Sequence, residues 1–70
     1  TIGRNDKNDL IIEDSTVSGN HCKVEYQSNQ YMIVDLNSTN GTKVNGENVS
    51  SCEVKQGDKI QLGKVQILVK

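Results

Sequence analysis

The chain has 70 residues and a net charge of −1, with 33% hydrophobic and 24% charged residues. A chain of this length forms one small domain with a modest core, which leaves room for a binding face and excludes a deep active site. The composition is that of a globular protein, and no apolar run approaches the roughly 18 residues of a membrane-spanning helix. We therefore expect a single domain over residues 1–70, with no membrane partner.

The basic residues are scattered among the acidic ones and form no stripe, so a nucleic-acid partner is not expected. Seven of the eight basic residues are lysines, and Arg4 is the single arginine. Because arginine alone presents a planar fork of N–H donors, Arg4 is the residue that would bind a phosphate through two parallel hydrogen bonds.

The two cysteines, Cys22 and Cys52, lack CxxC spacing and have a single histidine to join them. This argues against a zinc site, and we expect no metal and no cofactor. One disulfide stays an alternative, but reduced thiols fit the intracellular, cytoplasmic protein that an N-terminus unlike a signal peptide indicates. The chain begins at Thr1 without an initiator methionine, and we expect it to be a fragment of a longer protein.

Strands are expected throughout, because the chain has no proline and no alanine and nowhere repeats apolar residues at helical spacing. Several segments instead alternate apolar and polar residues, as strands with one buried face do. In chain order, the candidate strands are Leu10–Ile12, Cys22–Tyr26, Tyr31–Leu36, Ile60–Leu62 and Val65–Val69.

Turn-forming residues separate these segments so closely that only short strands fit between them. The turns are Ser28-Asn29, Asn40-Gly41, Asn45-Gly46, Gln56-Gly57-Asp58 and Leu62-Gly63-Lys64. Short strands with frequent turns predict an all-β fold, a small antiparallel β-sandwich. With no Phe or Trp, we expect a core of Ile, Val, Leu and the two tyrosines.

Three loops, at residues 3–5, 18–21 and 37–42, are dense in small and polar residues. Loops at one end of a sandwich converge on one surface. A phosphate monoester of charge about −2 is bound by a fork donor, a hydroxyl and backbone N–H groups, while side-chain amides bond the main chain of an extended peptide. The three loops contain these groups and therefore indicate a phosphopeptide site.

Five motifs occur in order along the chain: TIGR at 1–4, SxxH at 18–21, DLNSTNGT at 35–42, NG at 45–46 and GDxIxLG at 57–63. Together they resemble the forkhead-associated (FHA) domain family from end to end. The resemblance implies an intracellular signalling module for protein-protein interaction, whose partner is a threonine-phosphorylated protein or peptide. A Ser/Thr kinase upstream is then implied as well.

Roles for individual residues follow from the same resemblance. Arg4 would form the principal ion pair with the phosphate, and the Ser18 hydroxyl would bond a second phosphate oxygen. Thr39 and Asn40 would hold the peptide backbone, and a pocket beside them would take the methyl group that distinguishes phosphothreonine from phosphoserine. Five residues would be structural: Gly3, His21, Gly41, Asn45 and Gly46.

The chain departs from the family pattern directly after Ser18, where a residue with a polar side chain is common and Gly19 stands here. Three groups are candidates to supply the missing phosphate contact: the backbone N–H of Gly19 and the side chains of Asn20 and Lys43. The two side chains are therefore auxiliary candidates, and Gly19 is counted with the phosphate-binding residues.

Each of these residues also has an ordinary structural interpretation. A lone arginine in a loop is usually a solvated charge, and a loop serine usually bonds its own backbone. A phospho-independent interaction or assembly domain on the same fold is the alternative function, and Gly19 is the feature that favours it. An enzyme is not expected, because one histidine without a nucleophile motif or paired carboxylates supports no catalytic mechanism.

Overall fold

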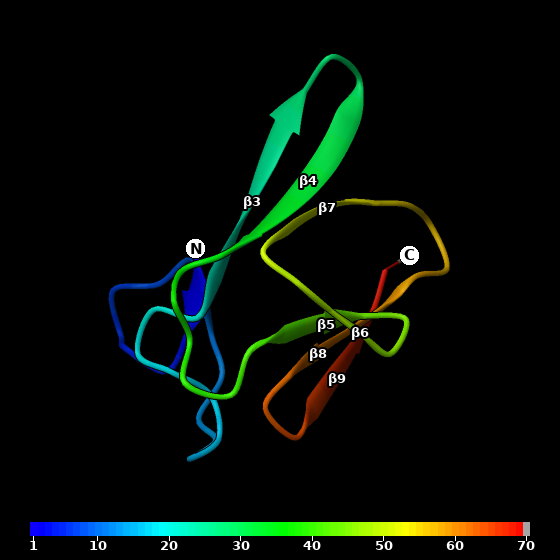
Figure 1. Ribbon diagram of the computed structural model, residues 1–70. Helices are drawn as coiled ribbons and strands as arrows, with labels where there is room; N and C mark the ends of the chain where they lie inside the picture. Colours follow the sequence, from blue (N-terminus) through cyan, green and yellow to red (C-terminus); the bar gives the residue numbers. More distant parts are fainter. Residues whose placement is uncertain (70) are drawn as a thin grey trace.

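The computed structural model describes residues 1–69, which form nine short strands (Figure 1). No helix in this part of the chain has the length and apolarity needed to cross a membrane. The strands are β1 (Ile2–Gly3), β2 (Leu10–Ile11), β3 (Cys22–Gln27), β4 (Gln30–Asp35), β5 (Thr42–Val44), β6 (Glu47–Val49), β7 (Ser51–Val54), β8 (Lys59–Leu62) and β9 (Val65–Leu68).

The strands form two sheets that face each other, and this confirms the predicted β-sandwich. One sheet has the order β2-β1-β3-β4-β7 and the other has the order β6-β5-β8-β9. All strand pairs are antiparallel except β1 with β2, which run parallel to each other. Strand β7 lies beside β4, although β6 and β8 on either side of it in sequence belong to the other sheet.

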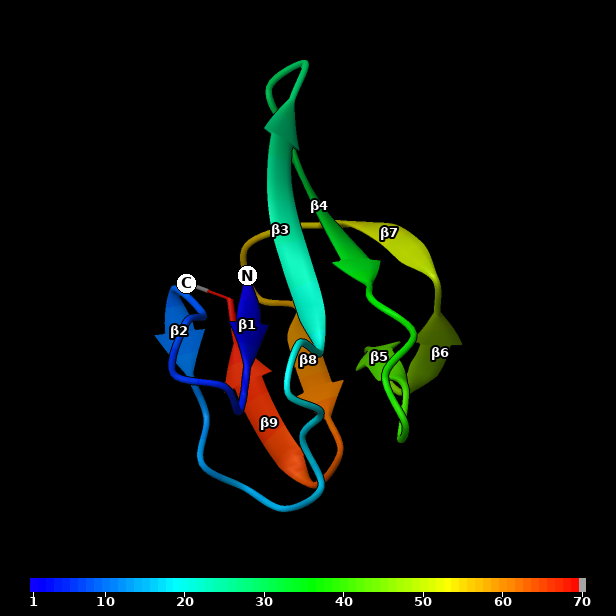
Figure 2. The same cartoon turned by 90° about the vertical axis from the view of Figure 1, so that its left-hand side faces the viewer.

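The core between the sheets consists of aliphatic residues and one cysteine: Val17, Cys22, Ile33, Val44, Val54, Ile60 and Leu62. The prediction that the two tyrosines belong to this core was wrong. Tyr26 is 58% exposed and Tyr31 is 55% exposed, and their rings pack on each other with centroids 4.6 Å apart. Their strands extend beyond the end of the opposite sheet (Figures 1 and 2), so the second layer leaves both tyrosines more than half exposed.

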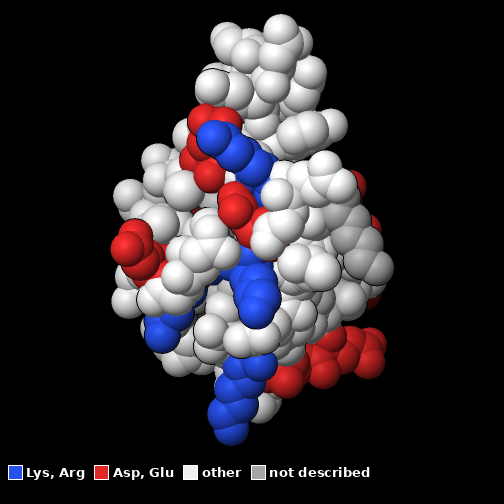
Figure 3. Space-filling view, turned by 90° about the vertical axis from the view of Figure 1, so that its right-hand side faces the viewer, with Lys and Arg blue, Asp and Glu red and all other residues white. Residues whose placement is uncertain are grey.

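Figure 2 shows the hairpin of β3 and β4 projecting from one end of the sandwich. Its two-residue turn has positive φ at both Ser28 and Asn29, the conformation that follows the natural twist of a hairpin. The projecting tip bears no charge in Figure 3, whereas basic and acidic side chains lie side by side on the rest of that face. This mixture agrees with the scattered charges of the sequence.

Candidate functional site

The loop after β1 lies against the loop before β3, at the end of the molecule opposite the hairpin tip (Figures 1 and 2). The backbone N–H of Arg4 donates to the carbonyl of Ser18 at 3.0 Å. The N–H of Asn5 donates to the carbonyl of Gly19, also at 3.0 Å. These bonds join the loop after β1 to the loop before β3, so two of the three predicted site loops are held together.

Gly3 is what allows this close approach. A Cβ at this position would lie 2.2 Å from the carbonyl oxygen of Gly19 and 2.8 Å from the side-chain nitrogen of Asn8. Both distances are far below van der Waals contact, so any side chain here would separate the loops. The structural role expected for Gly3 thus has a steric basis.

His21 joins the second loop to the third. Its side chain is fully buried, and its Nδ1 accepts a hydrogen bond from the backbone N–H of Ser18 at 3.0 Å. Its Nε2 lies 2.8 Å from the carbonyl oxygen of Gly41. Since a carbonyl can only accept, Nε2 carries the proton and the ring is the neutral tautomer. This position agrees with the architectural role expected for His21.

Two polar contacts connect the third loop with the region of Ser18. The Ser18 Oγ accepts the backbone N–H of Thr39 at 2.9 Å, which leaves the hydroxyl hydrogen free to donate to another group. The amide nitrogen of Asn40 donates to the carbonyl of Thr16 at 2.7 Å, which leaves its carbonyl oxygen available. Thr39 and Asn40 are both exposed, so a ligand could reach the groups that stay free.

Asp35, at the end of β4, anchors this third loop. Its carboxylate accepts hydrogen bonds from the hydroxyl of Ser38 and from the hydroxyl of the buried Thr42 at 2.7 Å. Burial acts to raise the pKa of Asp35, but these hydrogen bonds outweigh that effect, and the pKa lies below its ordinary value. Asp35 is therefore ionised at neutral pH and fixes both ends of the segment that presents Thr39 and Asn40.

Arg4 projects from this framework as an exposed cation. Within residues 1–69 its guanidinium makes no ion pair with an acidic side chain. Lys7, in the same loop, is also exposed and serves as a natural comparison. The fork of Arg4 is thus not engaged by these residues, although its backbone is fixed beside Ser18.

The three candidates for the additional phosphate contact, Gly19, Asn20 and Lys43, occupy different positions. Gly19 is half-buried, and the side chain of Asn5 covers it so closely that a Cβ would lie 2.9 Å from the Asn5 amide nitrogen. Asn20 is exposed beside it. Lys43 lies within β5, on the outer face of its sheet, because its neighbours Thr42 and Val44 point into the core. Asn20 thus lies in the loop itself, whereas Lys43 lies in a strand.

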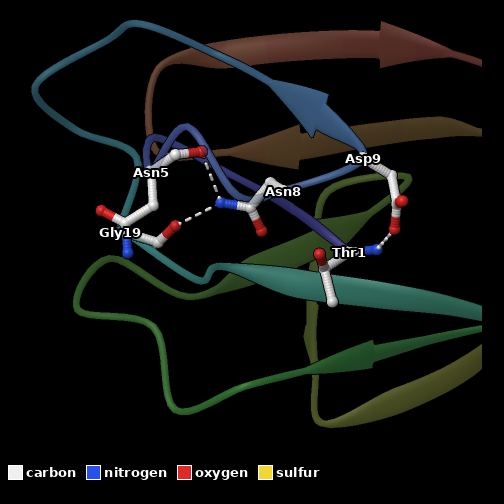
Figure 4. Close-up of polar contacts among 5 residues, drawn as sticks. All are labelled: Thr1, Asn5, Asn8, Asp9 and Gly19. Atoms are coloured by element: carbon white, nitrogen blue, oxygen red, sulfur yellow. Dashed lines mark hydrogen bonds and ion pairs between the residues drawn. The ribbon is translucent and has the colours of Figure 1, made fainter.

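Asn8 is a residue of this site that sequence reasoning missed. It is one of eight asparagines in the chain, and nothing in its spacing distinguished it from the others. It is 6% exposed, and its side-chain amide donates to the carbonyls of Asn5 at 3.0 Å and of Gly19 at 2.6 Å (Figure 4).

An apolar groove of about 350 Å³ lies between the sheets, away from the three loops. It is lined by Ile2, Leu10, Val24, Tyr31, Val54, Ile60, Ile67 and Val69. It contains none of the residues predicted to bind phosphate. Among residues 1–69, no three His, Cys, Asp or Glu side chains gather in a way that could hold a metal ion.

The comparison with known proteins identifies the family. The family model described as the FHA domain matches residues 1–63. The chain belongs to the FHA domain family. The FHA domain of FhaA, solved in complex with the intracellular domain of another protein, superimposes with a TM-score of 0.94 at 36% identity, over 99% of this chain and 76% of that chain.

Two further relatives bear on function. A solved FHA domain whose interactions are phosphothreonine-dependent has a TM-score of 0.92 and 36% identity, over 96% of this chain and 70% of that chain. The glycogen accumulation regulator GarA of Mycobacterium tuberculosis is 38% identical over 68 residues, which cover 97% of this FHA domain and 42% of GarA. The FHA domain thus spans less than half the length of this relative.

Proposed function

We propose that this FHA domain binds phosphothreonine in an extended peptide, and that it is a binding module with regulatory partners rather than an enzyme. The observation that carries the proposal is Arg4. Its backbone is bonded to Ser18, while its exposed guanidinium makes no ion pair within residues 1–69. The likeness to a phosphothreonine-dependent FHA domain over 96% of the chain adds support.

Each free donor has a counterpart in such a ligand. The guanidinium of Arg4 supplies a charge-assisted fork, and the hydroxyl hydrogen of Ser18 supplies a second donor. Asn40, whose carbonyl oxygen is free, can accept an N–H of the peptide backbone. The peptide would lie across the three loops, and the partner would be a threonine-phosphorylated protein modified by a Ser/Thr kinase.

The test is titration of the domain with a library of Thr-phosphorylated peptides and with the unphosphorylated peptides. We expect binding only with phosphate, and Arg4→Ala to cost about 2 to 5 kcal/mol, as truncation of one partner of a buried charge pair does. This corresponds to a loss of about 30-fold to several thousand-fold in affinity. Binding that is indifferent to phosphate would contradict the proposal.

Two matched variants sharpen the result. Lys7→Ala removes a cation from the same loop and is expected to change affinity much less, because a screened surface charge contributes little. Arg4→Lys keeps the charge but loses the fork, so it should lie between the wild type and Arg4→Ala. A phosphoserine version of the best peptide tests the predicted preference for phosphothreonine.

A second candidate function is a phospho-independent interaction, and the apolar groove favours it. The groove is bordered by Leu10 of β2 and Ile67 of β9, and both strands are sheet edges with unpaired backbone groups. An extended apolar segment of another protein could add to such an edge. Val24→Asp within the groove would abolish this interaction and would leave phosphopeptide binding unchanged.

The setting of the domain forms part of the proposal. We infer that residues 1–70 are one domain of a longer intracellular protein, as the coverage of 42% of GarA suggests. The domain would then supply the phosphopeptide contact, and the remainder of the protein would determine what that contact regulates.

A further inference from the structure

We infer that Asn8 is a positioning residue of the phosphate site. It clamps the loop that carries Arg4 to the loop that carries Ser18. The inference rests on the proposed phosphopeptide function and deepens it, because it assigns a role to a residue that would not touch the ligand. It depends on three features of Asn8, namely its two hydrogen bonds, its burial and its unpaired oxygen.

The two hydrogen bonds of the Asn8 amide nitrogen connect the loops. One goes to the carbonyl of Asn5, directly after Arg4, and the other to the carbonyl of Gly19, directly after Ser18. The backbone N–H of Asn8 also donates to the Asn5 carbonyl at 3.2 Å, so the turn over residues 5–8 closes on the same carbonyl oxygen that accepts the side-chain amide. One amide group therefore fixes both residues that follow the predicted phosphate ligands.

Burial makes these bonds costly to lose. Asn8 is one of three polar residues within residues 1–69 that are buried, together with His21 and Thr42. Without the side-chain amide of Asn8, the two carbonyls would lose the donor that joins them, and the Asn5 carbonyl would keep only the backbone N–H of Asn8. The Gly19 carbonyl would keep a single donor, the N–H of Asn5.

The side chain of Asn8 acts only as a hydrogen-bond donor, because its oxygen accepts no hydrogen bond from the part of the chain that the structure describes. It is buried and has no hydrogen-bond partner among residues 1–69, and in Figure 4 it points away from both carbonyls. The reverse orientation of the amide would place this oxygen against two other oxygens, so the assignment is fixed by chemistry. Gly3 completes the arrangement, because a Cβ there would collide with both the Asn8 amide and the Gly19 carbonyl.

The consequence for binding is geometric. Arg4 and Ser18 would have to meet one phosphate together, and the cost of ordering their loops would be added to every binding event if the loops separated in the free domain. Residues that orient the ligands of a metal ion without touching the metal typically change its affinity about tenfold to a hundredfold when they are replaced, and we expect an effect of similar size for Asn8.

The experiment uses Asn8→Leu, which has nearly the same shape but no donor, and introduces no charge near the phosphate. Its affinity for the best phosphothreonine peptide is measured beside a core variant of similar stability loss, Val54→Ala, with both proteins shown to be folded at the assay temperature. We expect Asn8→Leu to lose about tenfold to a hundredfold in affinity and Val54→Ala to lose almost none. Should Asn8→Leu fail to fold, Asn8→Ser takes its place: a hydroxyl can donate to only one of the two carbonyls, so the link between the loops is still broken and the same loss of affinity is expected.

A double-mutant cycle with Arg4→Ala gives the readout that a merely structural role would not change. If Asn8 acts through Arg4, Asn8→Leu costs little further affinity once Arg4 is gone. Full affinity in Asn8→Leu, or equal losses in Asn8→Leu and Val54→Ala, would overturn this inference and leave the proposed function intact. A wild-type domain that ignores the phosphate would overturn both.

Discussion

Among single residues, Ser18 and His21 each contribute to the fold in a way that prepares the site. The Ser18 hydroxyl bonds Thr39, 21 positions away, so it is not the local turn serine that its loop position alone suggests. His21 receives the Ser18 N–H on one nitrogen and donates to Gly41 with the other. The same few contacts therefore bring together the loops that are expected to hold phosphate and peptide.

Cys22 illustrates how burial decides reactivity. Its side chain is fully buried, and burial, with a smaller contribution from the charge of Asp35, raises the pKa of its thiol to about 11. A raised thiol pKa means that the neutral form stabilises the fold below the ordinary pKa of 9.0, and that this contribution is lost as the pH rises through 11. The thiolate that attacks disulfide reagents is therefore scarce at neutral pH.

We predict that Cys22 resists an aromatic disulfide reagent at pH 8 until the domain unfolds. Cys52→Ser, which leaves Cys22 as the single thiol, should show almost no labelling in buffer and complete labelling in urea. Cys22→Ser should still be labelled, because Cys52 is only half-buried. Rapid labelling of the Cys52→Ser protein in buffer would contradict this prediction.

Among the elements, the turn between β8 and β9 contacts the site through Thr16. The hydroxyl of Thr16 accepts the backbone N–H of Lys64 at 2.8 Å, and the Thr16 carbonyl accepts the amide of Asn40. Thr16 thus lies between this turn and the third site loop. Gly63, with a φ of +61°, makes the approach possible, because a Cβ there would lie 2.3 Å from the Thr16 carbonyl oxygen.

We predict that Gly63→Ala destabilises the domain more than Gly46→Ala and that only Gly63→Ala weakens peptide binding. Gly46 has a φ of +88°, and no atom lies within 4 Å of the position that a methyl group would take there. Its substitution therefore costs only the backbone strain, about 1 to 2 kcal/mol. Gly63→Ala adds a collision with Thr16, which displaces the partner of Asn40. Urea unfolding and phosphopeptide titration of both variants check this, and equal effects would contradict it.

Across the whole molecule, several carboxylates are stabilised by the hydrogen bonds that hold its loops. The pKa of Asp14 is lowered by the hydroxyl and N–H of Thr16, and that of Asp58 by the N–H of Lys55 and the amide of Asn45. The pKa of Asp35 is lowered as well. Most of these bonds close single loops, and the bond from Asn45 to Asp58 joins two turns, so ionised carboxylates stabilise several loops of the domain.

We therefore predict loss of stability in acid. A carboxyl whose folded pKa lies below its ordinary value of 3.8 stabilises the fold above that pH, and the contribution disappears as the pH falls through the folded pKa. The free energy of unfolding should therefore fall as the pH drops below about 4. Asp35→Asn should be less stable at pH 7 and less sensitive to acid, which urea titrations across this range would reveal; an unchanged acid response would contradict the role of Asp35.

Local patterns along the chain predict the all-β architecture and most residues of the candidate site, although strands β5, β6 and β7 were not among the candidate strands. Alternating segments separated by Asn-Gly and Gly turns specify short strands, because backbone conformation at such turns is a local property. The five motifs also single out Arg4, Ser18, Thr39 and Asn40 through their order and spacing, and the binding roles of these residues stay predictions.

Two features depend instead on how distant segments pack, namely which asparagine closes the site and which apolar residues are covered. Asn8 gains its role from the Gly19 carbonyl, eleven positions away, and a contact between loops leaves no periodic signal in the sequence. Tyr26 and Tyr31 have the alternation of buried residues but lie where the opposite sheet has ended. Whether a strand residue is buried depends on the opposite sheet as well as on its own strand. How far each sheet covers the other is decided only when the two sheets pack.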